Sequence, residues 1–309
     1  MGFRDIPQPF VCCVLIDDPT PEGVRRTMKL AEYEGADVFD LEIQALDPDY
    51  WNPAQLRPIF ETATKPIFTV FRRRTLRGTQ QVETETDEER MRLQLDLLDV
   101  GSLGFDLELD TFDPQPHPPF DSTEGKRYSY NRTSPPREIT TNPRAVERQM
   151  LVIEEAHRRG GDVLASTHNL TRLTPDGALA IGRLAEARGA DAVKIVQFCA
   201  CYEDVVESLM STVVLKRELK IPYILMAGGE YGKLTRAIAP LFGSMLVFAR
   251  QDYLPGGFLD QPPIRAMRSL FSSVDLRISK RADWFLPKET PEVVGAERRE
   301  TIEAPARTL

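Results

Sequence analysis

One lysine, Lys194, lies inside an otherwise apolar segment, GADAVKIVQF, at residues 189–198. The segment is typical of a buried β-strand, and lysine is rarely buried without a partner or a task, because removing an ammonium group from water is costly. Desolvation favours the neutral form of an amine, which can attack a carbonyl group and form a Schiff base. The alternative is a lysine that pairs with a carboxylate or reaches water at the strand end.

A histidine accompanies this lysine. His168 ends an apolar run, DVLASTHN, that precedes the run of Lys194, whereas His117 and His157 lie in a loop and on a polar helix. Neighbouring parallel strands lie about 4.8 Å apart, so the imidazole would lie beside the amine. Imidazole transfers protons near neutrality, and a Schiff base acidifies the adjacent carbon. The pair predicts enamine chemistry on a ketone, and the alternative for His168 is a core histidine bonded to the backbone.

Eight apolar runs alternate with stretches of helical period. The runs are 10–16, 36–43, 66–71, 104–110, 162–169, 189–198, 221–229 and 245–251. Several helices are predicted to begin at Thr or Asn followed by Pro, and one at the capping box of Thr86 and Glu89. Strands this apolar are typical of parallel sheets covered by helices, and eight such units close a barrel. We predict an α/β fold, a single (β/α)8 TIM barrel; an open doubly wound sheet would need a Gly-rich turn after the first run.

Two segments do not fit the repeat. Residues 113–141, after the fourth strand, are rich in Pro, Ser and Thr, and are longer than an ordinary βα loop. They would form a lid, an oligomer contact or simply a flexible loop. We predict a catalytic barrel domain over 1–274, with the insert at 113–141, and a C-terminal extension over 275–309.

Composition excludes several classes of function. The 309 residues are 41% hydrophobic and carry a formal charge of -8 without a basic run, which argues against a nucleic-acid-binding protein. No apolar stretch reaches the length of a membrane span. The spacing of the cysteines, at 12, 13, 199 and 201, is poor for disulfides or zinc, which favours free thiols and a cytoplasmic location.

On such a barrel, functional groups lie where strands end and in the loops that follow. The polar residues at those positions are Glu42, Gln44, Arg72, Asp106, Glu108, His168, Lys194, Glu230, Arg236 and Tyr253. The alternative for any one of them is an ion pair that closes the barrel.

From about Phe10 to Phe271 the chain resembles the type I 3-dehydroquinate dehydratases, which are Schiff-base (β/α)8 barrels. The motifs that carry the resemblance are GADVFDLE, PIFTVFR, GFDLELD, STHNLTRLTP, GADAVKI, GGEYGKLTR, LFGSMLVFA and LPGG. The resemblance implies catalytic roles for Lys194, His168 and Glu42. It implies that substrate is bound by Arg236, Arg72, Gln44, Tyr253 and Gly257. It also implies a homodimer that needs no metal or cofactor.

The mechanism that the resemblance implies begins with condensation of Lys194 with the C3 ketone of 3-dehydroquinate. His168 would take the C2 proton and then protonate the departing C1 hydroxyl, giving 3-dehydroshikimate after hydrolysis of the imine. Arg236 would hold the substrate carboxylate as a bidentate partner. Glu42 and Arg72 would bind ring hydroxyls and orient His168.

The chain also departs from the family pattern. Gln44 and Leu46 stand where the family has an arginine and an aspartate, and Arg73 to Gly78 replace an acidic residue and paired glycines. Tyr253 and Gly257 replace a serine and a glutamine in the last loop. The family uses such groups on substrate hydroxyls, so we expect the imine machinery to be retained and the substrate pocket to be altered.

Two alternatives therefore stay open. One is a paralogue with the same lysine chemistry on another hydroxy-keto acid or on a sugar phosphate, because glycines at 228, 229 and 232 follow the seventh strand, where many barrels bind phosphate. The other is a catalytically silent sensor domain. Retention of Lys194, His168 and Arg236 counts against the sensor.

Overall fold

The structure is a computed structural model that describes residues 1–77, 80–115, 123, 138–252 and 260–274. The chain divides into two units, Met1–Leu270 and Phe271–Leu309, and the barrel lies in the first. Most of the predicted insert and the whole extension over 275–309 lie outside the described residues, so the proposed boundary at 274 stays a prediction.

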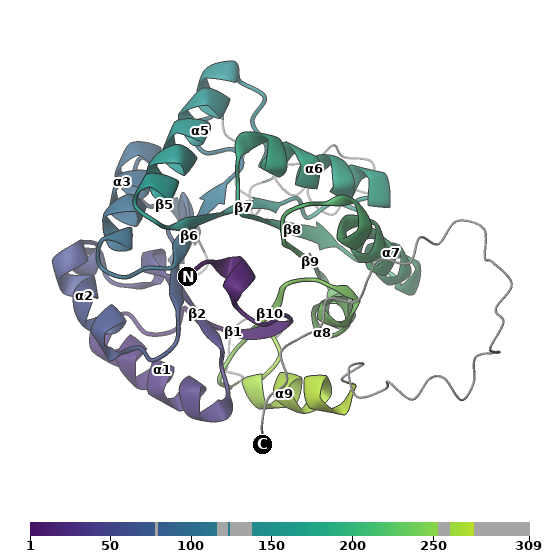
Figure 1. Ribbon diagram of the computed structural model, residues 1–309, viewed down its shortest axis with the longest axis horizontal. Helices are drawn as coiled ribbons and strands as arrows, with labels where there is room; N and C mark the ends of the chain where they lie inside the picture. The colour runs from purple at the N-terminus through teal and green to yellow at the C-terminus, as the bar shows by residue number, and fades with distance from the viewer. Residues whose placement is uncertain (78–79, 116–122, 124–137, 253–259, 275–309) are drawn as a thin grey trace, which may run out of the picture. The chain divides into compact units, whose positions relative to one another are not determined.

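Eight parallel strands form one sheet that curves into a nearly closed barrel, which confirms the predicted (β/α)8 fold (Figure 1). In spatial order they are β10 (Leu246–Ala249), β1 (Phe10–Leu15), β2 (Val38–Glu42), β3 (Ile67–Val70), β6 (Gly104–Glu108), β7 (Asp162–His168), β8 (Ala192–Phe198) and β9 (Tyr223–Gly228). Where β9 meets β10, the Met245 N–H donates a 2.7 Å hydrogen bond to the Tyr223 carbonyl. Each strand of the fold is thereby tied to its neighbours.

Helices surround the strands (Figure 1). They are α1 (Pro21–Glu34), α2 (Pro53–Thr62), α3 (Asp87–Leu98), α5 (Pro143–Arg158), α6 (Pro175–Arg188), α7 (Tyr202–Glu218), α8 (Gly232–Ile238) and α9 (Ile264–Ser273). The predicted caps are confirmed: Thr20, Asn52, Asn142 and Thr174 each accept a backbone N–H ahead of a first-turn proline. Gly189 ends α6 with φ of 91°, a left-handed conformation that favours glycine, and the chain turns there into β8.

Alternate residues of each strand face the barrel interior. Towards the strand starts these residues are apolar and include Cys12, Phe68, Leu164, Ala192 and Ile224, which belong to one buried cluster. On β6, β7 and β8 the next inward residue is polar: Asp106, Ser166 and Lys194 respectively, with Ser166 paired with Lys194. The functional groups therefore lie directly above this apolar cluster, which is called the apolar floor below.

Some short elements were not predicted. The polar segment after β3 forms an antiparallel hairpin of β4 (Arg74–Arg77) and β5 (Gln80–Glu83), whose charged residues hide any apolar alternation. A short 3-10 helix, η1 (Phe3–Asp5), lies at the strand-start end of the barrel. It is too short to produce a helical period in the sequence.

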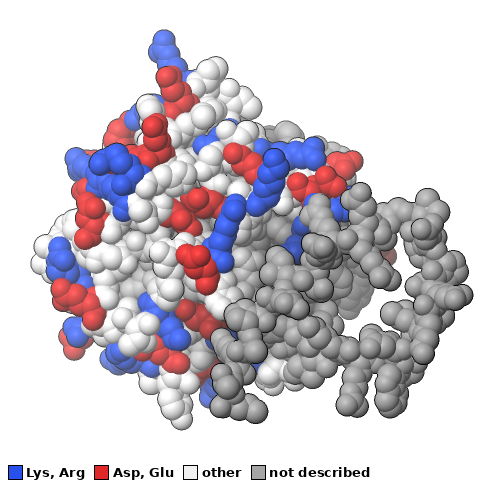
Figure 2. All heavy atoms as spheres, viewed as in Figure 1, with Lys and Arg blue, Asp and Glu red and all other residues white. Residues whose placement is uncertain are grey.

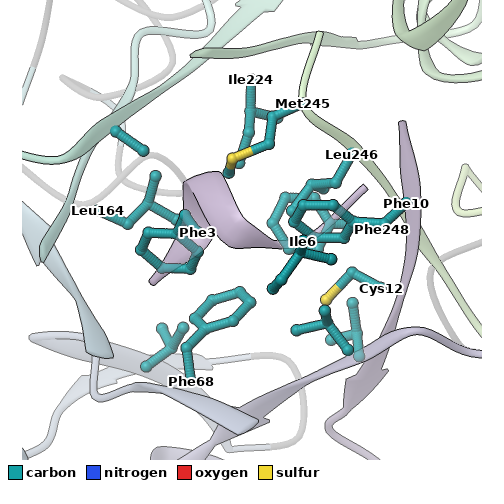
Figure 3. Packing of buried hydrophobic residues seen from close by; sticks show 14 of the residues in the cluster. Phe3, Ile6, Phe10, Cys12, Phe68, Leu164, Ile224, Met245, Leu246 and Phe248 are labelled. Atoms are coloured by element: carbon teal, nitrogen blue, oxygen red, sulfur yellow. The ribbon is translucent and has the colours of Figure 1, made fainter. Parts of the chain in front are cut away.

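The η1 segment fills this end of the barrel with side chains. Phe3 and Ile6 point into the ring of strands, among residues that include Phe68, Leu164 and Leu246 (Figure 3). The Phe3 ring meets the Phe68 ring edge to face at 5.6 Å, and the Phe3 N–H donates to Asp162 Oδ2 at 2.6 Å. This packing excludes water from the apolar floor beneath the polar layer.

The outer surface carries charges of both signs. On the face that Figure 2 shows, basic and acidic side chains lie next to one another. Ion pairs such as Arg159 with Asp99 and Arg148 with Glu88 join the neighbouring helices α3 and α5. Among the residues described, no helix is long and apolar enough to cross a membrane.

Truncation of Phe3 tests the role of η1. Phe3 is fully buried, so we expect Phe3→Ala to lower the free energy of unfolding by about 3 to 5 kcal/mol, through lost burial and the cavity left behind. Urea denaturation measures this difference. Tyr33→Ala, at a side chain that is 93% exposed, is the control and should change it by less than about 0.5 kcal/mol. A loss below about 1 kcal/mol for Phe3→Ala would show that η1 does not seal the barrel.

Candidate active site

Lys194 is buried at the centre of the polar layer and is paired. Its Nζ donates a 2.7 Å hydrogen bond to Asp106 Oδ2, while Ser166 Oγ donates to the other carboxylate oxygen at 2.5 Å. The Phe248 ring lies beside the ammonium group, 5.4 Å from Nζ to the ring centroid. The carboxylate partner that was the alternative interpretation of this lysine is therefore present. A nucleophilic amine at this position must first give up a proton.

Burial and neighbouring charges set the ionisation of the carboxyl groups around the lysine. Burial acts to raise the pKa of Asp106, but the charges of Lys194 and Arg72 overcome it and lower that pKa to about 2. Asp40, on β2, is also buried, and burial together with Glu42 raises its pKa well above the usual range. Asp106 is thus the carboxylate that balances Lys194, whereas burial and the charge of Glu42 both oppose ionisation of Asp40.

Arg72 follows β3 and lies among carboxylates from two strands. Its guanidinium nitrogens are 3.7 Å from Glu42 Oε2, 3.8 Å from Asp106 Oδ2 and 3.7 Å from Glu108 Oε1. Burial acts to lower the pKa of Arg72, but these carboxylates raise it overall, so the guanidinium stays charged. Arg72 therefore holds the acidic groups of the site together.

Glu108 is shared between the site and the wall of the barrel. Its Oε2 accepts hydrogen bonds from the Arg73 N–H at 3.0 Å and from Arg90 Nη1 at 3.1 Å. Asp87 in turn bridges Arg73 and Arg90, with contacts of 2.5 and 2.7 Å. This network fixes the backbone directly after β3, from which Arg72 extends.

His168 ends β7 and contacts two charged groups. Its Nδ1 lies 2.9 Å from Glu138 Oε2 and 3.3 Å from Arg72 Nη1, and its backbone N–H donates to the same glutamate oxygen at 2.7 Å. Burial acts to raise the pKa of Glu138, but the charge and hydrogen bonds of His168 lower it to about 2. Glu138 is thus a carboxylate that faces the imidazole.

The strand register separates the histidine from the lysine. Lys194 pairs with Ser166, so His168 lies two residues further along β7, about 7 Å higher at the strand rise, on the same inward face. The sequence predicted the two side chains to be beside one another. The structure instead offsets them by two residues along the strand direction.

Arg236 extends from the last turn of α8 to the same end of the barrel. Its Nη1 contacts Met226 Sδ at 3.3 Å. In the sheet register, Met226 on β9 lies opposite Val196 on β8, and Val196 lies opposite His168 on β7. The arginine therefore lies at the level of the histidine. Its Nη2 forms a 2.6 Å ion pair with Asp260. The guanidinium thus already binds a carboxylate at the mouth of the barrel.

The remaining predicted residues differ in their placement. Gln44 is buried, donates from Nε2 to Glu42 and accepts the Arg72 N–H at Oε1 over 3.1 Å, so its amide supports these two residues. Glu230 is exposed. Tyr253 and Gly257 lie outside the described residues.

Sequence reasoning missed three residues that contact the site. Asp40 and Ser166 lie one inward position below Glu42 and His168, and the alternation of β2 and β7 was the signal for both. Glu138 lies at the end of the Pro-rich insert, where nothing in the local pattern marks it. Among the described residues, no group of His, Cys, Asp and Glu has an arrangement that could hold a metal ion.

The ion pair with Lys194 gives a pH-dependent prediction. The pKa of Asp106 falls from 3.8 to about 2 on folding, so the pair stabilises the fold above pH 3.8 and this stability is lost as the pH falls towards 2. We expect Asp106→Asn to cost about 2 kcal/mol at neutral pH, with a smaller cost at about pH 3. Urea denaturation at both pH values measures it. Asp49→Asn, at an exposed aspartate, is the control, and an equal cost at both pH values would contradict the account.

Comparison with known proteins identifies the family and the fold. The family model of the type I 3-dehydroquinases matches residues 12–276. The crystal structure of 3-dehydroquinate dehydratase from Geobacillus kaustophilus is similar over 89% of this chain and 96% of its own, with a TM-score of 0.67 and 22% identity. A type I enzyme from Clostridium difficile also has a TM-score of 0.67, with 16% identity over 86% of this chain and 92% of its own.

Curated relatives match shorter stretches. A 3-dehydroquinate dehydratase from Alkaliphilus oremlandii is 39% identical over 32% of this chain and 39% of its own length. The Geobacillus kaustophilus enzyme is 42% identical over 30% of this chain and 36% of its own. The chain thus spans well under two thirds of these relatives in the matched stretches. Because the family model covers most of the sequence, the chain belongs to the type I 3-dehydroquinase family.

Proposed function

We propose that this chain is a carbon-oxygen lyase that dehydrates 3-dehydroquinate to 3-dehydroshikimate through an imine on Lys194. The observation that carries the proposal is the buried Lys194, paired with Asp106 on an apolar floor and followed on the same inward face by His168. Membership of the type I 3-dehydroquinase family supports the substrate.

Imine formation begins at Nζ. Transfer of a proton from the ammonium group to water frees a lone pair, which attacks the C3 carbonyl carbon, and the carbonyl oxygen takes up a proton to form a carbinolamine. Loss of the carbinolamine oxygen as water gives the protonated imine. The anionic Asp106, 2.7 Å from Nζ, stabilises this positive charge as it stabilised the ammonium group.

His168 then acts as base and acid. Its free ring nitrogen takes the C2 proton, and the electron pair of the C–H bond moves towards the iminium nitrogen to give an enamine. Return of that electron pair expels the C1 hydroxyl, which leaves as water with the proton from His168. Water hydrolyses the new imine, which releases the enone and restores Lys194. These reaction steps are redox-neutral and need no metal or cofactor.

Arg236 would bind the substrate carboxylate. Its ion pair with Asp260 supports this role, because the same guanidinium already binds a carboxylate at the level of His168. The substrate carboxylate would replace Asp260 as the partner of Arg236. Glu42 would act through Arg72, which contacts the ring of His168.

A second candidate function is the same imine chemistry on a different hydroxy-keto acid. Gln44 favours it, because both ends of its amide already bond to protein groups, which leaves this side chain less hydrogen-bonding capacity for a substrate hydroxyl. The assembled lysine, histidine and carboxylates argue against a silent sensor. The homodimer, the cytoplasmic location and the roles of Tyr253 and Gly257 stay predictions.

Replacement of the lysine tests both the activity and the imine. We expect Lys194→Ala to lower kcat by at least about 10⁴-fold, because the covalent intermediate cannot form. The enone absorbance of 3-dehydroshikimate, after addition of 3-dehydroquinate, reports turnover. Lys65→Ala, at an exposed lysine, should keep wild-type activity. Turnover by Lys194→Ala comparable to this control would refute the imine. Absence of turnover by well-folded wild-type protein would favour another hydroxy-keto acid.

A further inference from the structure

We propose that Glu138, at the end of the insert after β6, is the positioning residue that fixes the tautomer of His168. The inference rests on the proposed function, because it concerns the base of that reaction. Glu138 Oε2 accepts a hydrogen bond from the His168 backbone N–H at 2.7 Å and lies 2.9 Å from Nδ1 of the ring. One oxygen atom thus fixes the imidazole relative to its own backbone.

The two groups at Nδ1 have opposite effects on the ring. A carboxylate only accepts hydrogen bonds and an arginine only donates them, so Glu138 favours a proton on Nδ1 and Arg72 favours a lone pair there. Glu138 is closer, at 2.9 Å against 3.3 Å for Arg72 Nη1. With Glu138 present, the proton lies on Nδ1, and the lone pair of Nε2 is free to take a substrate proton.

Loss of Glu138 reverses this arrangement. Arg72 would remain at Nδ1, held by Glu42, Asp106 and Glu108, and would donate to it. The neutral ring would then carry its proton on Nε2, which cannot act as a base. The carboxylate therefore does more than hold the ring, because it decides which ring nitrogen is the base.

The backbone at Glu138 is itself held in an unusual conformation. Its φ of 52° lies in the left-handed region that non-glycine residues seldom adopt, and such residues persist where surrounding contacts determine the structure. Two residues later, the buried Thr140 donates its N–H to the Leu109 carbonyl at 3.0 Å, which ties this segment to the end of β6.

A buried arginine fastens the same segment to two helices. Arg188, in the last turn of α6, donates to the carbonyls of Leu109 at 3.0 Å and Thr140 at 2.6 Å, and to Gln149 Oε1 on α5 at 2.6 Å. These acceptors are neutral, and burial lowers the pKa of Arg188 to about 10. Glu138 is thereby held by the body of the barrel.

The tautomer of His168 is the direct test. The chain has only three histidines, so nitrogen-15 NMR of histidine-labelled protein, with His168→Gln to assign the signals, resolves this ring. At about pH 8.5, above the usual titration range of imidazole, we expect Nδ1–H in the wild type and Nε2–H in Glu138→Ala. Glu147→Ala, at an exposed glutamate on α5, is the matched control and should keep the wild-type signals.

Kinetics give the second readout. We expect Glu138→Ala to lower kcat roughly 100-fold, with KM changed less than about threefold and borohydride trapping of the imine retained. Glu138→Asp should recover part of kcat. An unchanged tautomer in Glu138→Ala, a kcat within about threefold of wild type, or a loss that falls mainly on KM or on imine trapping would overturn the proposal. If borohydride traps no imine on the wild-type protein and this protein does not turn over 3-dehydroquinate, the proposed function fails. The NMR result still decides whether Glu138 fixes the tautomer of His168.

Discussion

The buried ion pair between Lys194 and Asp106 is the interaction on which the rest of the site depends. An ammonium group in an apolar barrel is tolerated only with a carboxylate partner whose other oxygen is also bonded, and Ser166 provides that bond. The apolar floor beneath, closed by η1, keeps the pair away from water (Figure 3). The same low-dielectric surroundings would favour a positively charged imine at this nitrogen.

Above this pair, Arg72 prevents the acidic side chains from repelling one another. It lies within 3.8 Å of carboxylates from both β2 and β6, while Glu108 is also neutralised from the wall of the barrel by Arg90. This arrangement also places a strong hydrogen-bond donor, the Arg72 guanidinium, beside Nδ1 of His168. Glu138 is the acceptor that offsets the effect of this donor on the ring. The site is thus a balance of charges in which each ion has at least one fixed partner.

Residues on regular strands were predictable, and those held by tertiary contacts were not. The apolar runs of β7 and β8 placed His168 at the end of one strand and Lys194 within the next, because strands of this kind are visible in the sequence. The partner of Lys194 was on the short list of strand-end residues, but only the register shows that Asp106 reaches it. Glu138 was missed because contacts with His168 and Arg188 position its segment, and neither contact has a local sequence pattern.

The most direct measurement of the central claim is the site of covalent bond formation. Wild-type protein is incubated with 3-dehydroquinate and borohydride, digested, and its peptides are weighed by mass spectrometry. The account predicts a reduced adduct on the peptide that contains Lys194, and none on exposed lysines such as Lys65. Well-folded protein that forms no adduct, or an adduct on a different lysine, would contradict it.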